Sequence, residues 1–158
     1  MNCFSYLLAL VIALHSAAVH AQPSEDRPDP REAAIQSVLR SYVEAFNKKD
    51  VETVTAAWGD EASYHDRTTG ERMEGGEAIR KDIAENFKAH PKATLAASLD
   101  RIKFLTASVV QIAGQTVLST PEEEPQVSQF SAILVKSGEK WQIQSLEESA
   151  VPQPTTAY

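Results

Sequence analysis

Cysteine is almost absent from this chain of 158 residues, which has a single one, Cys3, close to its start. Cys3 lies in an N-terminal apolar segment that we expect to be removed, and the mature chain would then contain no cysteine. This excludes a disulfide framework and a catalytic thiol from the mature protein. A hydrophobic core must hold the fold together, and the remaining chain is long enough to build one.

The residue patterns of several enzyme classes are also missing. The six glycines form neither a Gly-x-Ser-x-Gly motif nor a glycine-rich phosphate loop. Only two histidines follow the N-terminal segment, His65 and His90, and they lie too far apart for a local metal motif. We therefore expect no metal site and no cofactor.

Positive charge is scarce as well. The chain has 22 acidic and 15 basic side chains, and its isoelectric point is about 5.1. Such a surface repels the phosphates of nucleic acids and anionic lipids. We expect no nucleic acid as a partner.

The only long apolar run lies at the N-terminus, from residue 4 to residue 19, within a stretch of 21 residues that has no charged side chain. Its length and the small residues at its end, Val19 and Ala21, are typical of a secretory signal peptide cleaved before Gln22. The missing Lys or Arg near Met1 leaves an uncleaved anchor as the alternative. With cleavage, we expect a secreted or periplasmic protein without a membrane segment. Residues 22–28 are polar and predict a disordered leader.

Three helices are expected in the first half of the mature chain. Asp29 is a good N-cap, with Pro30 at the first helical position and Glu32 placed for a capping box. Asp50 caps a second helix that is expected to reach Trp58. Each helix has an apolar face with spacings of three and four residues. The face of the first helix contains Ile35, Val38, Leu39, Tyr42 and Phe46. The second face contains Val51, Val54 and Trp58, and the third contains Ile79, Ile83 and Phe87.

Strands dominate the rest of the chain. Residues 62–66 and 72–74 predict a short hairpin, and residues 93–105, 109–119, 127–136 and 141–149 predict four long strands joined as a meander, because Val, Ile, Leu and Phe alternate there with polar residues. Helices followed by an antiparallel sheet indicate the α+β class, with the helices packed on one face of a curved sheet.

Several short stretches carry a family resemblance. They are Ala45-Phe46-Asn47 with Asp50, Trp58 with Asp60-Glu61-Ala62, Asp66 with Thr68-Thr69-Gly70, Gly76-Glu77-Ala78-Ile79, and the closing segments 130–135 and 138–143. In this order and spacing they resemble the SnoaL-like superfamily, which shares the cone fold of nuclear transport factor two and ketosteroid isomerase. The closing hairpin looks like that of the SgcJ/EcaC branch.

The resemblance implies a strongly bent sheet and three helices around an internal pocket. It also implies a homodimer, because relatives often pair through the outer face of the sheet. The domain would span residues 29–150, followed by a flexible tail at 151–158. Since this fold supports many activities, the function has to be argued from the pocket residues.

Compared with ketosteroid isomerase, Tyr42 matches the catalytic tyrosine and Asp66 matches the base at the end of the first strand. The isomerase also needs a protonated aspartic acid on a late strand, where this chain offers Gln129 and Ser131. An amide or a hydroxyl is a weaker donor to a developing enolate than a carboxylic acid.

Each candidate has an alternative role. Asp66, expected to have a raised pKa at the pocket mouth, can act as a base or accept turn hydrogen bonds from Thr68 or Thr69. Tyr42 can donate to a ligand or simply pack in the core. Tyr64 shares the strand parity of Asp66 and is expected to be a pocket wall, while His65 points to the other face. Trp58 is a further ligand contact or a packing residue.

We therefore expect a domain that binds a small, largely apolar molecule inside the cone. Isomerase, lyase or hydrolase chemistry would use Asp66 as base and Tyr42 as hydrogen-bond donor. The alternative is a non-catalytic domain that binds a ligand, a protein partner or a second copy of itself.

Overall fold

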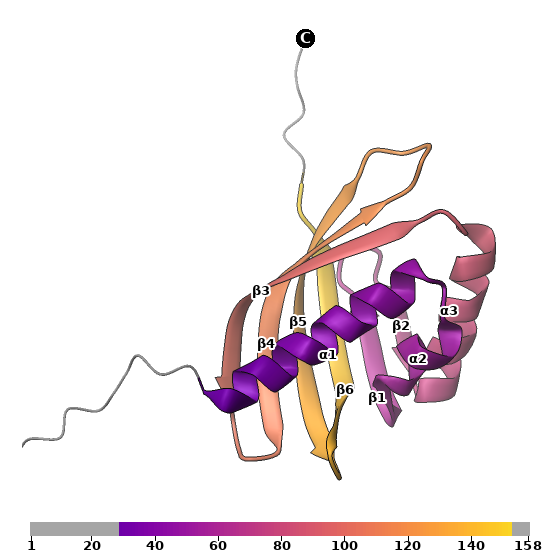
Figure 1. The fold of residues 1–158 in the computed structure, drawn as a ribbon. Coiled ribbons are helices and arrows are strands. Elements are labelled where there is room, and N and C mark those ends of the chain that lie inside the picture. Colours follow the sequence, from indigo (N-terminus) through magenta and orange to yellow (C-terminus); the bar gives the residue numbers. More distant parts are fainter. Residues whose placement is uncertain (1–28, 153–158) are drawn as a thin grey trace, which may run out of the picture.

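Three helices and six strands form the part of the chain that the structure, a computed structural model, describes, residues 29–152 (Figure 1). The expected signal peptide, the expected leader and most of the expected tail lie outside these residues. The helices are α1 (Pro30–Asn47), α2 (Val51–Ala56) and α3 (Gly76–Ala89). The strands are β1 (Trp58–Asp66), β2 (Arg72–Glu74), β3 (Thr94–Phe104), β4 (Val109–Ser119), β5 (Gln126–Ser137) and β6 (Lys140–Ala150).

The strands form one sheet in the order β2-β1-β6-β5-β4-β3. Strands β3 to β6 make the predicted antiparallel meander, and β1 pairs in parallel with β6, which is the last strand of this meander. The predicted α+β class is therefore confirmed. The pairing of β1 with β6 brings the first and last strands together, and it places Tyr64 beside Leu146 and Asp66 beside Glu148.

Helix α1 lies across one face of the sheet, which we call the inner face (Figure 1). Asp29 caps the helix as predicted, accepting a hydrogen bond from the Arg31 backbone at 2.9 Å. The Arg31 guanidinium lies 4.0 Å from the centre of the Phe104 ring at one end of the helix. At the other end, the Asn47 amide exchanges hydrogen bonds of 3.0 and 2.7 Å with the Leu95 backbone. The helix is thus attached to β3 at both ends.

Strand β1 begins at Trp58, four residues before the predicted start, and the expected helical role of Trp58 is wrong. Helix α2 ends at Ala56, and Trp58 pairs with Ile143 of β6. The Ile143 amide donates to the Ala57 carbonyl oxygen at 2.7 Å, which extends the sheet to the end of α2. Tertiary strand pairing therefore overrides the helical spacing of Val54 and Trp58.

A bulge and a glycine bend the sheet between β3 and β4. The pairing shifts between Leu99 and Arg101, so Asp100 is the extra residue of a bulge. Gly114 faces this bulge, and a Cβ atom there would lie 1.9 Å from the Ser98 carbonyl oxygen. Only glycine permits so close an approach of the two strands. The bend helps the sheet to curve around α1.

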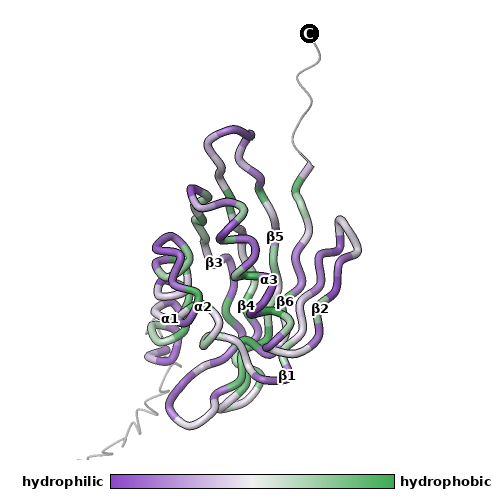
Figure 2. The backbone as a smooth tube through the Cα atoms, turned by 90° about the vertical axis from the view of Figure 1, so that its right-hand side faces the viewer, coloured by the Kyte–Doolittle hydropathy of each residue, from purple (hydrophilic) through white to green (hydrophobic). Residues whose placement is uncertain are grey.

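The core lies between the helices and the inner face. Its fully buried side chains include Ile35 of α1, Ile79 of α3, Val110 of β4 and Leu134 of β5. Viewed from the side, α1 and the sheet form separate layers, while the long loop between β4 and β5 is hydrophilic (Figure 2). The space under the middle of α1 is where the core contains a cavity.

Candidate functional site

A small apolar cavity lies between α1 and the inner face of the sheet. Its volume is about 60 Å³. Tyr42, Thr116 and Glu148 are the lining residues with polar side chains. The remaining walls are Ile35, Val38, Leu39, Leu95, Ala97, Ile112, Phe130, Ala132, Leu134, Ile143 and Leu146. A ligand in this space would meet hydrocarbon on most sides and find its hydrogen bonds at a few points.

Glu148 and Tyr64 form a hydrogen-bonded pair next to this cavity. The Tyr64 hydroxyl donates to Glu148 Oε1 at 2.7 Å, and both side chains are partly buried. Burial raises the pKa of Glu148, the hydrogen bond from Tyr64 lowers it, and the nearby charge of Asp66 raises it, with a net upward shift. Burial, and then the bond to Glu148, raise the pKa of Tyr64 far above its usual range. The pair therefore combines a permanently protonated phenol with a carboxyl group of raised pKa.

Tyr42 approaches the same cavity from α1. Tyr42 is partly buried, and burial raises the pKa of its hydroxyl to about 12. The indole N–H of Trp58 acts to lower that pKa, although the two groups do not reach hydrogen-bond geometry. Trp58 is 6% exposed, and among the described residues its Nε1 has no acceptor. Both groups are protonated donors at neutral pH.

Asp66 lies at the end of β1 and is not a wall of the cavity. Its Oδ1 accepts hydrogen bonds from the backbone N–H groups of Thr68 at 2.7 Å and Thr69 at 3.2 Å. Burial acts to raise the pKa of Asp66, but the hydrogen bonds from both threonines outweigh it, and the net shift is downward. The expected upward shift is therefore wrong, and Asp66 makes the turn hydrogen bonds that are the alternative to its catalytic role.

Gln129 and Ser131 were expected to lie near Tyr42, but they do not. Strand alternation on β5 turns Phe130 and Ala132 towards α1, and Gln129 and Ser131 consequently face the opposite, outer side of the sheet. They are not placed to complete a site inside the cone.

Glu148, which the sequence reading missed, takes the inner-face position that these two residues were expected to fill. It lies directly across from Phe130. Trp141 and Ile143 face inwards, and simple alternation would send Glu148 outwards. A register shift at this point leaves Gln144 without a partner and reverses the parity of the residues that follow. The apolar Leu146, out of phase with Ile143, is the only sign of the shift in the sequence.

A comparison with protein families identifies the chain. Residues 35–154 match the model of the SnoaL-like domain. The chain belongs to the SnoaL-like domain family. Its assignment to the SgcJ/EcaC branch stays a prediction. No curated protein sequence matches this SnoaL-like chain.

Solved structures share the fold of this SnoaL-like domain. A domain of unknown function from Nostoc punctiforme has a TM-score of 0.68 and 20% identity over 77% of this chain and 78% of that one. An NTF-2-like protein of unknown function from Shewanella oneidensis has a TM-score of 0.65 and 18% identity over 75% of this chain and 98% of that one. A ketosteroid isomerase-like protein from Erwinia carotovora has a TM-score of 0.65 and 17% identity over 79% of this chain and 99% of that one. At these identities the likeness shows the fold alone.

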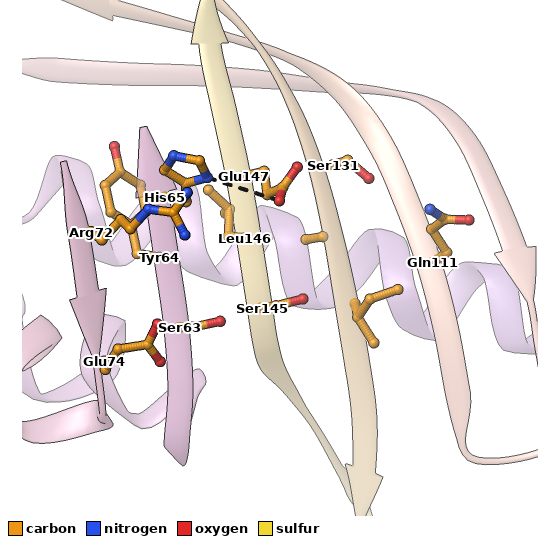
Figure 3. Close-up of a pocket in the computed structure, with 12 residues that line it drawn as sticks. Ser63, Tyr64, His65, Arg72, Glu74, Gln111, Ser131, Ser145, Leu146 and Glu147 are labelled. Carbon is orange, nitrogen blue, oxygen red and sulfur yellow. Dashed lines mark ion pairs between the residues drawn. The ribbon is translucent and has the colours of Figure 1, made fainter. Parts of the chain in front are cut away.

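The larger hollow of the SnoaL-like domain lies on the outer face, and Tyr64, whose hydroxyl is bonded to Glu148, is one of its lining residues. Its volume is about 310 Å³ (Figure 3). His65 points into it, as its strand parity predicted, and its Nδ1 lies 3.9 Å from Glu147 Oε1. Ser131 lines this hollow instead of the inner cavity.

Two features are absent from the described residues of the SnoaL-like domain. Between residues 29 and 152, no three His, Cys, Asp or Glu side chains are grouped so that they could hold a metal ion. Within the same range, no helix is long and apolar enough to cross a membrane.

Proposed function

We propose that the SnoaL-like domain binds a small, largely apolar molecule between α1 and the sheet, and that Glu148 exchanges a proton with it. The observation that carries this proposal is the apolar cavity at which Tyr42 and Glu148 meet. Binding sites for small molecules combine apolar walls with a few fixed polar groups in this way. Groups with displaced pKa values beside a cavity are a second feature of functional sites.

The proposed roles follow from the hydrogen bonds. Glu148 has a raised pKa and is held at one oxygen by Tyr64, which suits it to general acid and base chemistry. Tyr42 has a buried hydroxyl and keeps the proposed role of donor to a ligand oxygen. Asp66 contributes its charge, which raises the pKa of Glu148, while its own carboxylate serves the turn. In this proposal Glu148 takes the place of Asp66 as the acid or base.

The size of the cavity sets a condition for binding. A volume of 60 Å³ is the liquid share of about two water molecules, whereas pockets for drug-sized ligands have about 300–1,000 Å³. A ligand with a ring therefore requires α1 to move away from the inner face. Helix α1 is attached to the sheet near its two ends, at Arg31 and Asn47, and the part of the helix between them lies above the cavity.

A fragment screen by NMR tests the proposal. We expect neutral cyclic ketones or phenols to shift the amide signals of residues around Tyr42 and Glu148. Tyr42→Phe and Glu148→Gln should each weaken binding by about five- to tenfold, the effect of one lost hydrogen bond in a dry site. Gln129→Ala, on the outer face, is the matched control and should bind as the wild type does. Fragments that bind equally well to all four proteins would contradict this proposal.

The alternative is a non-catalytic domain that pairs with a second copy or another protein. The observation in its favour is the hollow outer face of the sheet, which has no covering element among the described residues. Sedimentation at micromolar concentration distinguishes the two. A stable dimer together with an empty fragment screen would favour the non-catalytic role.

We also propose that the domain works outside the cytoplasm, on the basis of the uncharged apolar segment before Gln22. Mass spectrometry of the exported protein should find Gln22 at the N-terminus. An N-terminus at Met1 would instead support the uncleaved anchor.

A further inference from the structure

The outer hollow is built from two rows of side chains that cross the sheet. Strand register places Arg72, His65, Glu147 and Ser131 in one row. The second row runs through Glu74, Ser63, Ser145, Ile133 and Gln111. Figure 3 shows these side chains standing on the same face of neighbouring strands. Because they come from five strands of one sheet, their relative positions are fixed by backbone pairing.

The hollow forms where three serines leave space between longer side chains. Ser63, Ser145 and Ser131 are partly buried, whereas Arg72 and Glu74 are exposed at the edge of the sheet. Gln111 closes the opposite side. The resulting volume of about 310 Å³ reaches the lower end of the range for small-molecule pockets.

Most polar groups of this hollow have hydrogen-bonding capacity to spare. The exceptions are Glu147, which lies 3.9 Å from His65 and 3.8 Å from Arg67, and Tyr64, whose hydroxyl donates to Glu148. Among the described residues, no side-chain hydrogen bond or ion pair engages the three serines, Gln111, Arg72 or Glu74. Three hydroxyls, one amide, one guanidinium and one carboxylate therefore face the same space.

This set of groups selects against several kinds of ligand. Apolar molecules would leave the hydroxyls unpaired and desolvated. Anions would meet two carboxylates, Glu74 and Glu147, on a chain with a formal charge of −7. A neutral molecule with several hydroxyl groups can accept from Arg72, donate to Glu74, and do both with the serine hydroxyls and the Gln111 amide.

We propose that the outer hollow binds a carbohydrate, with one sugar ring over Ser63, Ser145 and Ser131 and its hydroxyls bonded to Arg72, Glu74 and Gln111. This site is separate from the cavity under α1, because its polar side chains stand on the outer face and the two spaces share only Ala132 and Leu146 as lining residues. Its failure would leave the proposed function unaffected. A second copy of the chain is the competing occupant, but stable dimer interfaces have apolar centres, and the centre here brings three serine hydroxyls together with one aliphatic side chain, Ile133.

Titration of the folded domain with single monosaccharides, followed by the amide signals in NMR, tests this site. Glucose, galactose, mannose and N-acetylglucosamine are the probes. We expect at least one of them to shift residues 63–65, 131–133 and 145–147, with saturation at millimolar concentration. Ser63→Ala and Ser145→Ala should each raise the Kd by about fivefold, the effect of one hydrogen bond. Arg72→Gln, at an exposed position that tolerates substitution, should weaken binding to a similar extent.

Gln129→Ala is the control, since Gln129 lies on the same face of β5 outside the hollow. It should leave the Kd unchanged. The proposal is overturned if none of the four sugars shifts these residues, or if the three variants bind like the wild type. It is also overturned if sedimentation shows a dimer that Ser131→Arg dissociates, because the second copy would then cover the hollow.

Discussion

Glu148 receives opposing influences from its neighbours, and they define the site at the scale of single residues. Its burial and the charge of Asp66 favour the protonated form, while the Tyr64 hydroxyl favours the carboxylate. The pKa of Glu148 therefore depends on two residues of β1 that can be changed one at a time. Each change has a different expected sign.

Tyr64→Phe removes the hydroxyl that lies 2.7 Å from Glu148 Oε1. The pKa of Glu148 should rise further, because the bond that lowers it is lost. The free energy of unfolding at pH 7 should fall by about 1–2 kcal/mol, since a partly buried carboxylate loses its donor. Urea unfolding at pH 7 and pH 4 measures both effects, and the loss should shrink at pH 4, where the carboxyl group is closer to neutral.

The control for this change is Tyr64→Phe in a Glu148→Gln background. A double-mutant cycle isolates the coupling between the two side chains. A coupling energy near zero at pH 7 would show that the hydrogen bond does not contribute in solution.

Asp66→Asn separates the two roles that we considered for this residue. One amide oxygen can accept both turn hydrogen bonds, because Asp66 Oδ1 alone accepts from Thr68 and Thr69. The variant should keep its stability within about 0.5 kcal/mol, whereas Asp66→Ala should lose about 1 kcal/mol. The pKa of Glu148 should fall in Asp66→Asn, since a neighbouring negative charge is gone. Carbon-detected NMR titration of Glu148 measures that shift, and an unchanged pKa would contradict the coupling.

At the scale of the element, the sequence predicts starts of helices better than parities along strands. Asp29 and Asp50 act as N-caps at the expected residues, because a cap depends on local geometry. The position of Glu148 depends on a bulge that appears only when β6 pairs with β5. The same holds for Trp58, whose strand forms by pairing with Ile143. On β1 the predicted parity holds, since His65 points into the outer hollow and Tyr64 reaches Glu148, although Tyr64 is not a wall of the inner cavity as expected. On β6 the side-chain direction was not predictable.

Gly114→Ala tests whether the bulge and the close approach of β3 and β4 shape the sheet. The added Cβ would lie 1.9 Å from the Ser98 carbonyl oxygen, and a backbone atom cannot give way cheaply. We expect a loss of about 1–3 kcal/mol in urea unfolding.

Gly59→Ala in β1 is the matched control for this prediction. Its Cβ would meet the end of the Gln144 side chain at 3.0 Å, and that flexible side chain can move. The loss should therefore be clearly smaller than at Gly114. Equal losses at the two positions would show that the bulge is not the cause.

At the scale of the whole molecule, the sheet separates two environments of opposite character. The inner face and α1 enclose an apolar cavity with a partly buried acid, and the outer face carries a mostly polar hollow with three serine hydroxyls and exposed charges. The fold determined both faces through strand alternation, but only the bulge on β6 put an acid inside. Stability of the whole domain should therefore depend on pH through groups of opposite behaviour.

Glu148→Gln tests this dependence. The raised pKa of Glu148 means that the folded state binds a proton at this carboxyl group more tightly than the unfolded state does. The resulting contribution of Glu148 to stability is complete below the ordinary pKa of 4.5, and it is lost as the pH rises through the pKa of the folded state. The amide of the variant does not titrate and has no such loss, and we expect the variant to be as stable as the wild type at pH 3.5 and more stable at pH 7. The pKa of Asp66 is shifted down from 3.8, and its contribution is lost in both proteins as the pH falls through its folded pKa. Thermal unfolding of both proteins between pH 3 and pH 8 measures their difference in stability. The effect of Asp66 is the same in both proteins and cancels in this difference. A difference that is constant across this range would show that Glu148 titrates equally in the folded and unfolded states.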